Sequence, residues 1–267
     1  MNRPSTPVEE ATIAAFERDG AVPVRGRFDA WVDSLRRGVE HNIAHPGPDV
    51  RDYRDEGGGR FFGDYCNWSR IPEYREFLFE SQAADIARAL MRSETARLFH
   101  EHVLVKETET GIPTPWHQDL PYYCVDTELS CSLWLVLDPV PLETCAQFVA
   151  GSHRWGKLYR PERFNRTPLN AGDPLDAPPD IDAHRDDYDI LRWALEPGDA
   201  VAFTFRTLHG APPNRSPHRR RRAFSSRWVG DGATFAVREG VTSPPFREVR
   251  LAHGAPLDGP EFPLVRG

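Results

Sequence analysis

His117 and Asp119 place an imidazole and a carboxylate two positions apart in the chain. Pro115 and Pro121 favour an extended backbone there, and side chains two positions apart on an extended strand leave the same face. A second imidazole, His209, follows an apolar segment far downstream. Two histidines and one carboxylate that leave further positions open form the facial triad of non-haem Fe(II) oxygenases. The spacing therefore predicts an iron site made of His117, Asp119 and His209.

The His-x-Asp spacing alone has a second interpretation, a hydrogen-bonded pair on the protein surface. The chain contains 10 histidines and 40 acidic residues, so such pairs arise by chance. Two neighbouring features favour the metal site. His209 precedes Gly210 at the expected end of a strand, and a run of four arginines, 219–222, follows shortly after it. A guanidinium can bind the carboxylate of a dicarboxylate cosubstrate through two hydrogen bonds.

Length and composition limit the class of protein. The 267 residues, with 27% charged and 39% hydrophobic side chains, suit one domain over 1–267. We expect a helical part to about 92, a β core over about 93–230 and a tail over 231–267. A net charge of −7 argues against a nucleic-acid partner. The chain has no apolar run of roughly 20 residues that could span a membrane, and its first ten residues do not resemble a signal peptide.

The four cysteines form no CxxC pair, so the sequence predicts neither a zinc knuckle nor a redox motif. Buried, reduced thiols in a cytoplasmic protein are the expected alternative. The predicted partner is a small molecule, and the sequence does not indicate an oligomeric state.

The elements that would position the triad begin with helices. Thr6-Pro7-Val8-Glu9 has the pattern of a capping box, and Gly20 can end the helix that it starts. Further helices are expected from Asp29 and over 72–92. Prolines and the glycine run 57–59 predict a loop over 45–60, and the polar-aromatic segment 60–68 then reads as an irregular lid or plug.

Short strands are expected after residue 93. Alternation over 98–106 puts His100, His102, Leu104 and Lys106 on one face. Other strands are expected at 116–119, 131–137, 145–150, 188–193, 200–205 and 221–229. Aromatic residues in the tail should pack back on the body. Helices followed by many short strands predict a mainly β fold, a two-sheet jelly roll with flanking helices.

Several motifs in this order resemble the phytanoyl-CoA dioxygenase family of Fe(II)/2-oxoglutarate oxygenases, which includes ectoine hydroxylase. The resemblance covers about residues 10–230. The motifs that carry it are Phe16-Glu17-Arg18-Asp19-Gly20-Ala21, His117-Gln118-Asp119-Leu120, Trp134, Ala150-Gly151-Ser152-His153-Arg154-Trp155-Gly156, Glu196-Pro197-Gly198-Asp199, His209-Gly210 and Arg221-Arg222-Ala223-Phe224-Ser225. The resemblance implies a cupin-like double-stranded β-helix with iron held by His117, Asp119 and His209. Its cosubstrates would be 2-oxoglutarate and O₂.

The resemblance also assigns the cosubstrate contacts. Alignment of Arg-x-Ala-x-Ser with the last strand of the family selects Arg221 for the remote carboxylate of 2-oxoglutarate. The distance from His209 differs by one residue, which leaves Arg220 as an alternative. Gln118 and Trp134 occupy positions where the family contacts 2-oxoglutarate. Lys106 and His102, on one strand face, are further candidates for the same cavity.

Asp119 bears on the reaction that the resemblance implies. Related halogenases have a small residue where this chain has a carboxylate, so hydroxylation of a small polar or anionic metabolite is expected. Desaturation, cyclisation or epimerisation at the same site stays open, as does a β-helix that binds ligand without turnover. Side-chain type suggests substrate contacts from Arg60, Tyr65, Trp68, Tyr122, Tyr123 and Arg206.

Overall fold

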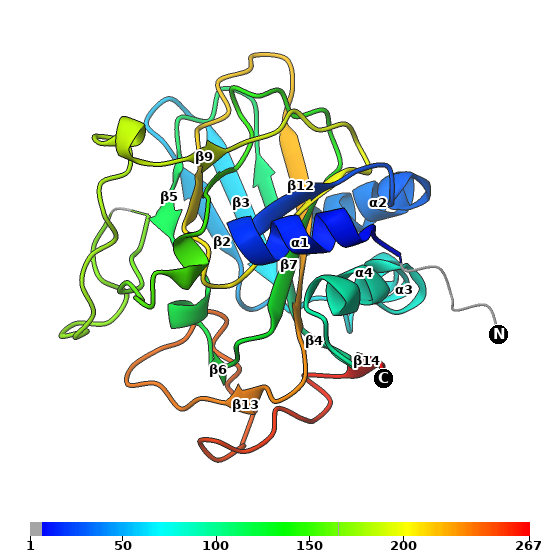
Figure 1. Ribbon diagram of the computed structural model, residues 1–267. Coiled ribbons are helices and arrows are strands. Elements are labelled where there is room, and N and C mark those ends of the chain that lie inside the picture. The colour runs from blue at the N-terminus through cyan, green and yellow to red at the C-terminus, as the bar shows by residue number, and fades with distance from the viewer. Residues whose placement is uncertain (1–6, 165) are drawn as a thin grey trace.

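The computed structural model describes residues 7–164 and 166–267, and the main element of this part is an antiparallel sheet of eight strands (Figure 1). Its order is β1-β10-β7-β12-β4-β3-β2, with β14 beside the start of β4. The strands are β1 (Ala21–Val24), β2 (Arg51–Arg54), β3 (Arg60–Tyr65), β4 (Ala96–Lys106), β7 (Ser130–Val136), β10 (Ala200–Phe203), β12 (Arg221–Val229) and β14 (Leu264–Arg266).

A smaller sheet faces the first across a cavity. Its order is β5-β11-β8-β9, formed by β5 (Thr114–His117), β8 (Gln147–Val149), β9 (Ile190–Leu191) and β11 (His209–Ala211). A two-stranded pair, β6 (Val125–Asp126) with β13 (Thr234–Phe235), lies at one end. Short 3₁₀ turns occur at Asp29–Trp31, Leu120–Tyr122, Ser152–Arg154 and Arg185–Asp187. This is the mainly β, two-sheet jelly roll with flanking helices that the sequence predicts.

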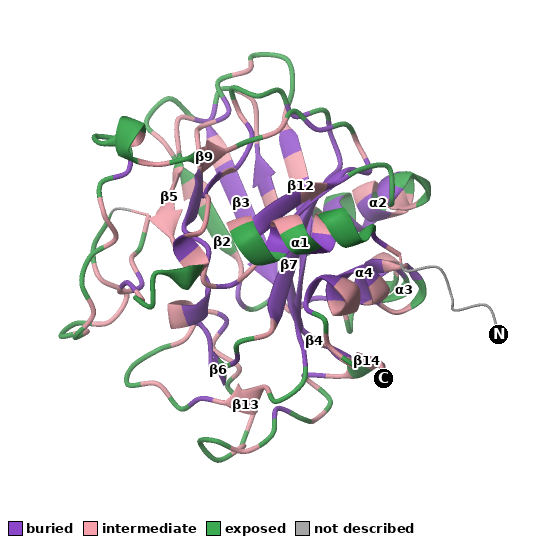
Figure 2. Ribbon diagram, viewed as in Figure 1, coloured by how far each residue is buried: buried purple, intermediate pink, exposed green. Residues whose placement is uncertain are grey.

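The four helices of the described chain cover the face of the large sheet that is turned away from the cavity. They are α1 (Glu10–Asp19), α2 (Val32–Ala44), α3 (Pro72–Glu80) and α4 (Ala83–Leu90). Each presents apolar residues to the sheet and polar ones to solvent, so its ribbon changes colour around its circumference in Figure 2. Gly20 ends α1 in the left-handed conformation, with φ of 78° and its N–H bonded to Phe16 O.

Alternation along β4 and β12 divides their side chains between two environments. Val103 and Val105 of β4 and Phe224 of β12 lie in the core beneath the helices. Residues at the intervening positions line the cavity. The period-2 pattern therefore predicted correctly which face of β4 carries Lys106.

Four predictions about local structure need correction. Residues 45–60 are not all loop, and segment 60–68 is not irregular, because β2 and β3 pair around the glycine run. β3 also pairs with β4, with Phe61 and Tyr65 facing the cavity and Phe62 the helices. The expected helix over 72–92 is divided at Ser81, between α3 and α4. Thr6 lies outside the described residues, and α1 begins only at Glu10, without a side-chain cap from Glu9.

The tail returns to the body, as expected. Phe235, Phe246, Leu251 and Phe262 pack in a cluster around Phe99 and Phe205. The cysteines are unpaired, and three of the four are buried. Within the described chain, no helix combines the length and apolar character needed to cross a membrane. The division of the single domain into parts near residues 92 and 230 stays a prediction. β1, β2 and β3, from the part expected to be helical, join the same sheet as the later strands.

Candidate metal centre and cosubstrate cavity

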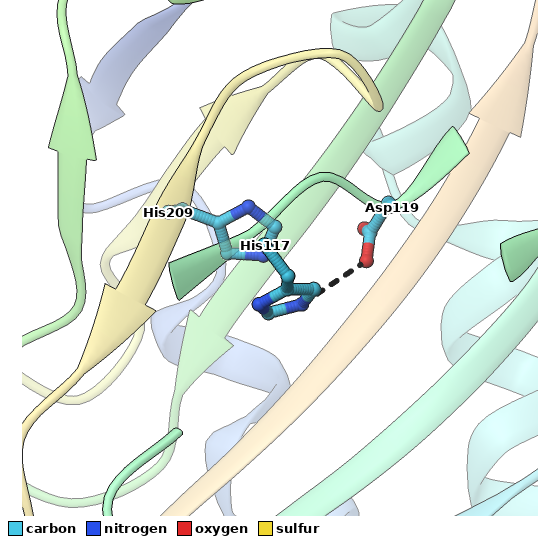
Figure 3. A group of neighbouring side chains, drawn as sticks. All are labelled: His117, Asp119 and His209. Carbon is cyan, nitrogen blue, oxygen red and sulfur yellow. Dashed lines mark ion pairs between the residues drawn. The ribbon is translucent and has the colours of Figure 1, made fainter. Parts of the chain in front are cut away.

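His117, Asp119 and His209 come together at one point of the cavity wall (Figure 3). His117 ends β5 and His209 begins β11, and the two residues are direct partners in the pairing of these strands. Asp119 lies in the turn after β5, with its Oδ1 3.6 Å from His117 Nε2. The three residues each offer one ligand atom, all within 4.8 Å of one another. Strand register and the following turn therefore assemble the triad.

Backbone carbonyls determine which nitrogen of each histidine is free. His117 Nδ1 is 2.8 Å from the carbonyl oxygen of Pro115, and His209 Nδ1 is 2.9 Å from that of Thr207. Because a carbonyl oxygen can only accept, each Nδ1 carries the hydrogen and each Nε2 keeps its lone pair. Metal-binding histidines usually donate their second N–H in this way. Two such nitrogens and one carboxylate fit the iron that the triad predicts.

Arg227 of β12 lies behind Asp119. Its Nε is 3.4 Å from Asp119 Oδ2 and also donates to the Tyr123 hydroxyl, while the Ser132 hydroxyl donates to the same carboxylate oxygen at 3.4 Å. Burial alone would raise the pKa of Asp119, but the charge of Arg227 holds it well below its ordinary value. Burial lowers the pKa of His209 to about 3. An ionised carboxylate and a neutral imidazole are the forms that bind a metal.

A cavity of about 770 Å³ lies between the two sheets and contains the triad in its wall. Two cations, Arg221 of β12 and Lys106 of β4, line another part of it. They are direct strand partners, only 6% and 1% exposed. The Arg221 guanidinium donates to the carbonyl oxygen of Thr144, and Lys106 Nζ donates to that of Pro212 at 3.1 Å. Neither is paired with an acidic side chain of the described residues.

The surroundings of the two cations are unfavourable to their charge. Burial lowers the pKa of Arg221 to about 10. Burial, and then Arg221 itself, holds the pKa of Lys106 well below its ordinary value. Two buried cations without an acidic partner favour an anionic ligand between them. The wall beside them includes Trp134 of β7, whose ring centroid is 5.8 Å from the Arg221 guanidinium carbon.

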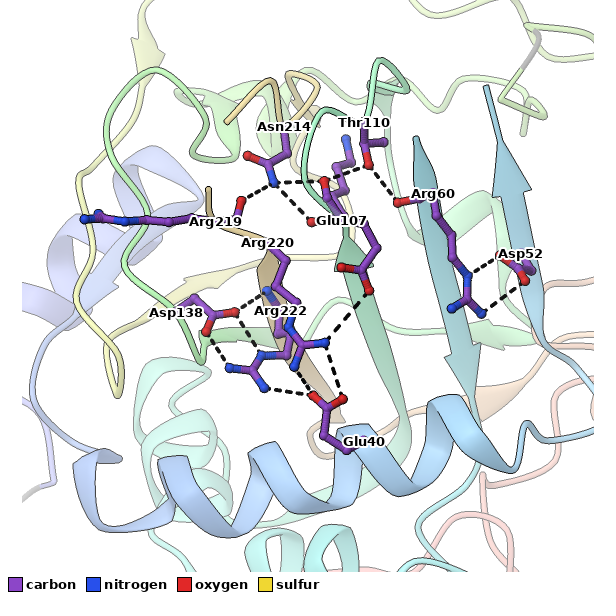
Figure 4. A network of polar contacts seen from close by, with 11 residues as sticks. Glu40, Asp52, Arg60, Glu107, Thr110, Asp138, Asn214, Arg219, Arg220 and Arg222 are labelled. Atoms are coloured by element: carbon purple, nitrogen blue, oxygen red, sulfur yellow. Dashed lines mark hydrogen bonds and ion pairs between the residues drawn. The ribbon is translucent and has the colours of Figure 1, made fainter. Parts of the chain in front are cut away.

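The other arginines of the basic run are directed elsewhere (Figure 4). Arg220 forms ion pairs with Glu40 of α2 and, at 3.9 Å, with Glu107. Arg222 pairs with Asp138 at 2.6 Å and with Glu40 at 2.9 Å. Arg219 is exposed. Alternation along the strand thus places Arg221 alone of the four in the cavity wall, and Arg220 is no longer a competing candidate.

Gln118 does not face the cavity, and the structure does not support its predicted contact with the cosubstrate. Its Nε2 donates to the carbonyl oxygens of Arg206 at 2.8 Å and Lys157 at 3.2 Å, and its Oε1 accepts from Tyr159 N–H at 3.1 Å. Gln118 directly follows His117, the last residue of β5, and successive side chains along a strand point to opposite sides. Gln118 therefore holds neighbouring loops together behind the triad.

Three of the predicted substrate contacts also lie away from the cavity. Arg60 pairs with Asp52 at 2.8 Å on the edge of the large sheet. Trp68 packs against Phe79 under the helices, and Arg206 forms an ion pair with Glu128. Side-chain type could not reveal these positions, because they depend on strand register. The remaining predicted residues, His102, Tyr65, Tyr122 and Tyr123, do line the cavity.

Sequence reasoning missed Arg227, His100 and Phe148. Arg227 continues the alternation of Arg221 and Ser225 along β12, and this signal could have identified it. The alternation along β4 predicts that His100 faces the cavity, as it does in the structure, but no motif marks it as a functional residue. Phe148, the strand partner of His209, lies with its ring nearly parallel to the imidazole at a centroid distance of 5.9 Å. No local pattern marks that contact.

The phytanoyl-CoA dioxygenase (PhyH) family model matches residues 16–223. This span includes the triad, Trp134 and Arg221. The chain belongs to this family. A member of the phytanoyl-CoA dioxygenase family is a 2-oxoglutarate-dependent non-haem iron oxygenase, which uses iron, 2-oxoglutarate and O₂. No curated protein matches the chain at a significant level.

Solved structures share the fold of this family member. The carbocyclase SnoK from nogalamycin biosynthesis is 22% identical with a TM-score of 0.75, covering 98% of this chain and 99% of its own. The epimerase SnoN from the same biosynthesis is 24% identical with a TM-score of 0.75, and the match covers 97% of this chain and 96% of SnoN. EctD from S. alaskensis, solved with 2-oxoglutarate and 5-hydroxyectoine, is 18% identical with a TM-score of 0.71, and the match covers 98% of this chain and 91% of EctD.

Proposed function

We propose that this phytanoyl-CoA dioxygenase family member hydroxylates an unactivated C–H bond of a small polar or anionic metabolite. One oxygen atom of O₂ enters the substrate, and the other enters succinate, which forms from 2-oxoglutarate with loss of CO₂. The observation that carries the proposal is one cavity that contains both the two-histidine, one-carboxylate triad and two buried cations. Among residues 7–164 and 166–267, neither cation pairs with an acidic side chain.

Each residue has a separate task in this proposal. His117, Asp119 and His209 hold the iron, which when bound supplies the site for O₂ activation. Arg221, supported by Lys106, binds the remote carboxylate of 2-oxoglutarate, and Trp134 packs beside its carbon chain. Arg227 and Ser132 fix the orientation of the Asp119 carboxylate by hydrogen bonds.

The Asp119 carboxylate supports hydroxylation over halogenation. A halide would need the coordination position that the carboxylate takes, and the contacts of Asp119 with Arg227 and Ser132 hold it in that position. Ring closure and epimerisation remain possible outcomes of C–H oxidation in this fold, since SnoK is described as a carbocyclase and SnoN as an epimerase. Product analysis distinguishes them.

The test supplies the purified protein with Fe(II), 2-oxoglutarate and O₂ and measures succinate across a metabolite panel. We expect substrate-dependent succinate and a product that gains one oxygen atom, labelled when ¹⁸O₂ is used. A product that loses two hydrogens would identify desaturation or cyclisation, and an isomer of unchanged mass would identify epimerisation. The oxygenase proposal would be refuted if no succinate forms with any compound of the panel and none forms when no compound is added.

Two variants connect the activity to the triad. His117→Ala and Asp119→Gly should each abolish succinate formation, because each leaves two protein ligands for the metal. His184→Ala is the matched control, since His184 is an exposed histidine outside the cavity. Succinate formation that survives in His117→Ala would show that the metal lies elsewhere.

A further inference from the structure

Two strands of the large sheet, β2 and β3, line the cavity without carrying any residue assigned to the metal or the cosubstrate. In the proposed function Arg221 of β12 holds one end of 2-oxoglutarate. The metal holds the other end, and its carboxylate ligand Asp119 contacts Arg227 of β12 and Ser132 of β7. Both ends of the cosubstrate are therefore held over β12 and β7. The sheet order β7-β12-β4-β3-β2 leaves the wall formed by β3 and β2 to the substrate.

Arg51, the first residue of β2, lies in this part of the wall. Its guanidinium carbon is 5.7 Å from the centre of the Tyr65 ring, on β3. Neighbouring strands are about 4.8 Å apart, so β3 is about 10 Å from β12 and Arg221. The four carbon–carbon bonds of 2-oxoglutarate, at about 1.5 Å each, span at most about 6 Å. A cosubstrate held between Arg221 and the metal therefore leaves Arg51 to another ligand.

Positive charge predominates in the cavity wall. Within the described chain, its charged lining residues are six cations and two carboxylates, namely Arg51, Lys106, Arg163, Arg221, Arg227, Arg247, Asp119 and Glu162. Both carboxylates have cationic partners, since Asp119 contacts Arg227 and Glu162 pairs with Arg160 at 3.0 Å. A cleft lined mainly by charges of one sign attracts ligands of the opposite sign. The wall therefore favours anionic ligands.

Arg51 has no acidic partner among the described residues. It donates through Nη1 to the backbone carbonyl oxygens of Asp49 at 3.3 Å and Val50 at 3.2 Å, and its Nε and Nη2 meet no acceptor in this part of the chain. The Asp49 carboxylate pairs instead with Arg247 at 2.7 Å. Arg163 also lacks an acidic partner, but it is on a loop and donates to a carbonyl oxygen of that loop at 2.6 Å. Arg51 is thus the unmatched cation that a strand holds in the wall.

The groups around Arg51 leave its donors accessible from the cavity. Its strand partner, Gly63, lines the cavity and has no side chain to stand between the guanidinium and the interior. The hydroxyls of Tyr65 and Ser243 lie 3.1 Å apart, and both residues line the cavity. Their mutual bond uses one hydroxyl hydrogen, so the other can be donated to a ligand. Tyr53, two residues along β2, adds an aromatic surface on the same face.

We propose that Arg51 binds a carboxylate group of the substrate, with the Tyr65–Ser243 hydroxyl pair as a second donor. A guanidinium can bind a carboxylate through two parallel hydrogen bonds, and the rings of Tyr53 and Tyr65 lie beside the carbon skeleton. The acid group then stays at the cavity mouth, since Arg51 is exposed, while the C–H bond to be oxidised lies deeper, at the metal. This inference rests on the proposed function and narrows its substrate class to carboxylic acids.

The test uses the protein loaded with Zn(II) in place of iron and saturated with 2-oxoglutarate, so that no turnover occurs and Arg221 is occupied. The probes are two acid–amide pairs of nearly equal shape: 2-naphthoate with 2-naphthamide, and benzoate with benzamide. ¹H–¹⁵N spectra of the arginine Nε–H groups follow each titration, and the Arg51 resonance is identified by its loss in Arg51→Gln. We expect the acids to shift this resonance and 2-naphthoate to bind at least threefold more tightly than its amide.

Arg51→Gln should weaken 2-naphthoate binding about 3- to 12-fold, as loss of a hydrogen bond does, and should change 2-naphthamide binding less than twofold. Added NaCl should weaken binding of the acid and not of the amide, because salt screens exposed charges. Arg54→Gln is the matched control, since Arg54 is an exposed arginine of the same strand that pairs with Asp52 at 3.7 Å and does not line the cavity. It should change binding of either probe less than twofold.

The proposal is wrong if neither acid shifts the Arg51 resonance, if the amides bind as tightly as the acids, or if both variants lose affinity equally. These outcomes are separate from those of the proposed function. Acid binding through Arg51 in a protein that never forms succinate would support the subsite and refute the oxygenase. Succinate formation that neutral compounds stimulate, and that Arg51→Gln does not change, would support the oxygenase and refute the subsite.

Discussion

Arg221→Gln should weaken 2-oxoglutarate binding far more than Arg220→Gln. Arg221 is 6% exposed and pairs with no acidic side chain in the described part of the chain, so a bound carboxylate would meet a desolvated guanidinium. Removing one partner of such a buried charge pair costs about 2–5 kcal/mol. Lys106 stays beside the site and should limit the loss to about 2–3 kcal/mol, roughly 30- to 140-fold in Kd.

Isothermal titration of the Mn(II)-loaded protein with 2-oxoglutarate measures this difference without turnover. Arg220→Gln is the matched control, because its side chain pairs with Glu40 on the helical side of the sheet. The Kd of Arg220→Gln for 2-oxoglutarate should stay within about twofold of the wild type, because Arg220 does not line the cavity. The lost surface ion pair should lower the stability of the fold by only about 0–1 kcal/mol.

Thermal unfolding supplies a second readout. A ligand present at 100 times its Kd stabilises the folded state by about 2.7 kcal/mol, so 2-oxoglutarate should raise the Tm of the wild type and of Arg220→Gln. At the same concentration, 2-oxoglutarate should raise the Tm of Arg221→Gln by much less. An unchanged Kd in Arg221→Gln, or an equal loss in both variants, would show that the cosubstrate carboxylate binds elsewhere.

Three further predictions concern the core, a buried cation and the loops at the cavity mouth. Phe224→Ala should destabilise the fold by about 3–5 kcal/mol in urea unfolding, because its fully buried ring packs on Tyr74 and Phe77; a cost below about 1 kcal/mol would contradict this packing. Without cosubstrate, stability should rise with pH between the lowered pKa of folded Lys106 and its ordinary value of 10.5, because the unfolded chain then binds more protons than the folded one. Lys106→Met should remove that rise in urea unfolding at a series of pH values, and an unchanged slope would exclude Lys106 as its cause. Asn170→Ala should speed hydrogen exchange of the Val241 amide about 2- to 12-fold, because the Asn170 amide bonds both backbone groups of Val241; equal exchange rates would show that this contact does not hold the loop.

Much of the site was predictable because its signals are local. The His-x-Asp spacing marks His117 and Asp119 as candidate ligands, although Asp119 lies in the turn after β5 and not on an extended strand. Alternation on β12 places Arg221, and neither Arg220 nor Arg222, in the cavity wall. The expected contact of Gln118 with the cosubstrate rests on the family resemblance alone. In the structure its side chain bonds to the backbone of Arg206, Lys157 and Tyr159 instead.

The parts that were not predictable depend on contacts between distant strands. Segment 45–68 has glycines and prolines that suggest a loop, but pairing of β3 with β4 imposes a strand on it. Arg60, Trp68 and Arg206 have side chains suited to binding a polar metabolite, and only the register of the sheets shows that they face other neighbours. Phe148 reaches His209 through a strand pair that no sequence spacing encodes.

The groups assigned to the cosubstrate belong to different sheets. His117 and His209 lie in the β5–β11 pair of the small sheet, and Arg221 and Lys106 in the β12–β4 pair of the large one. If the triad holds the metal and Arg221 binds the remote carboxylate, as proposed, a bound diacid would bridge the two sheets. The distance between the sheets would then limit the length of diacid that fits.

That spacing is set by apolar contacts between the sheets, such as Phe148 with Phe203 at a ring-centroid distance of 5.1 Å. If the diacid binds as proposed, this apolar layer of the cavity wall would therefore help to select its chain length. Exchanging side chains in this layer would retune the preference between homologous oxoacids while every polar contact kept its identity.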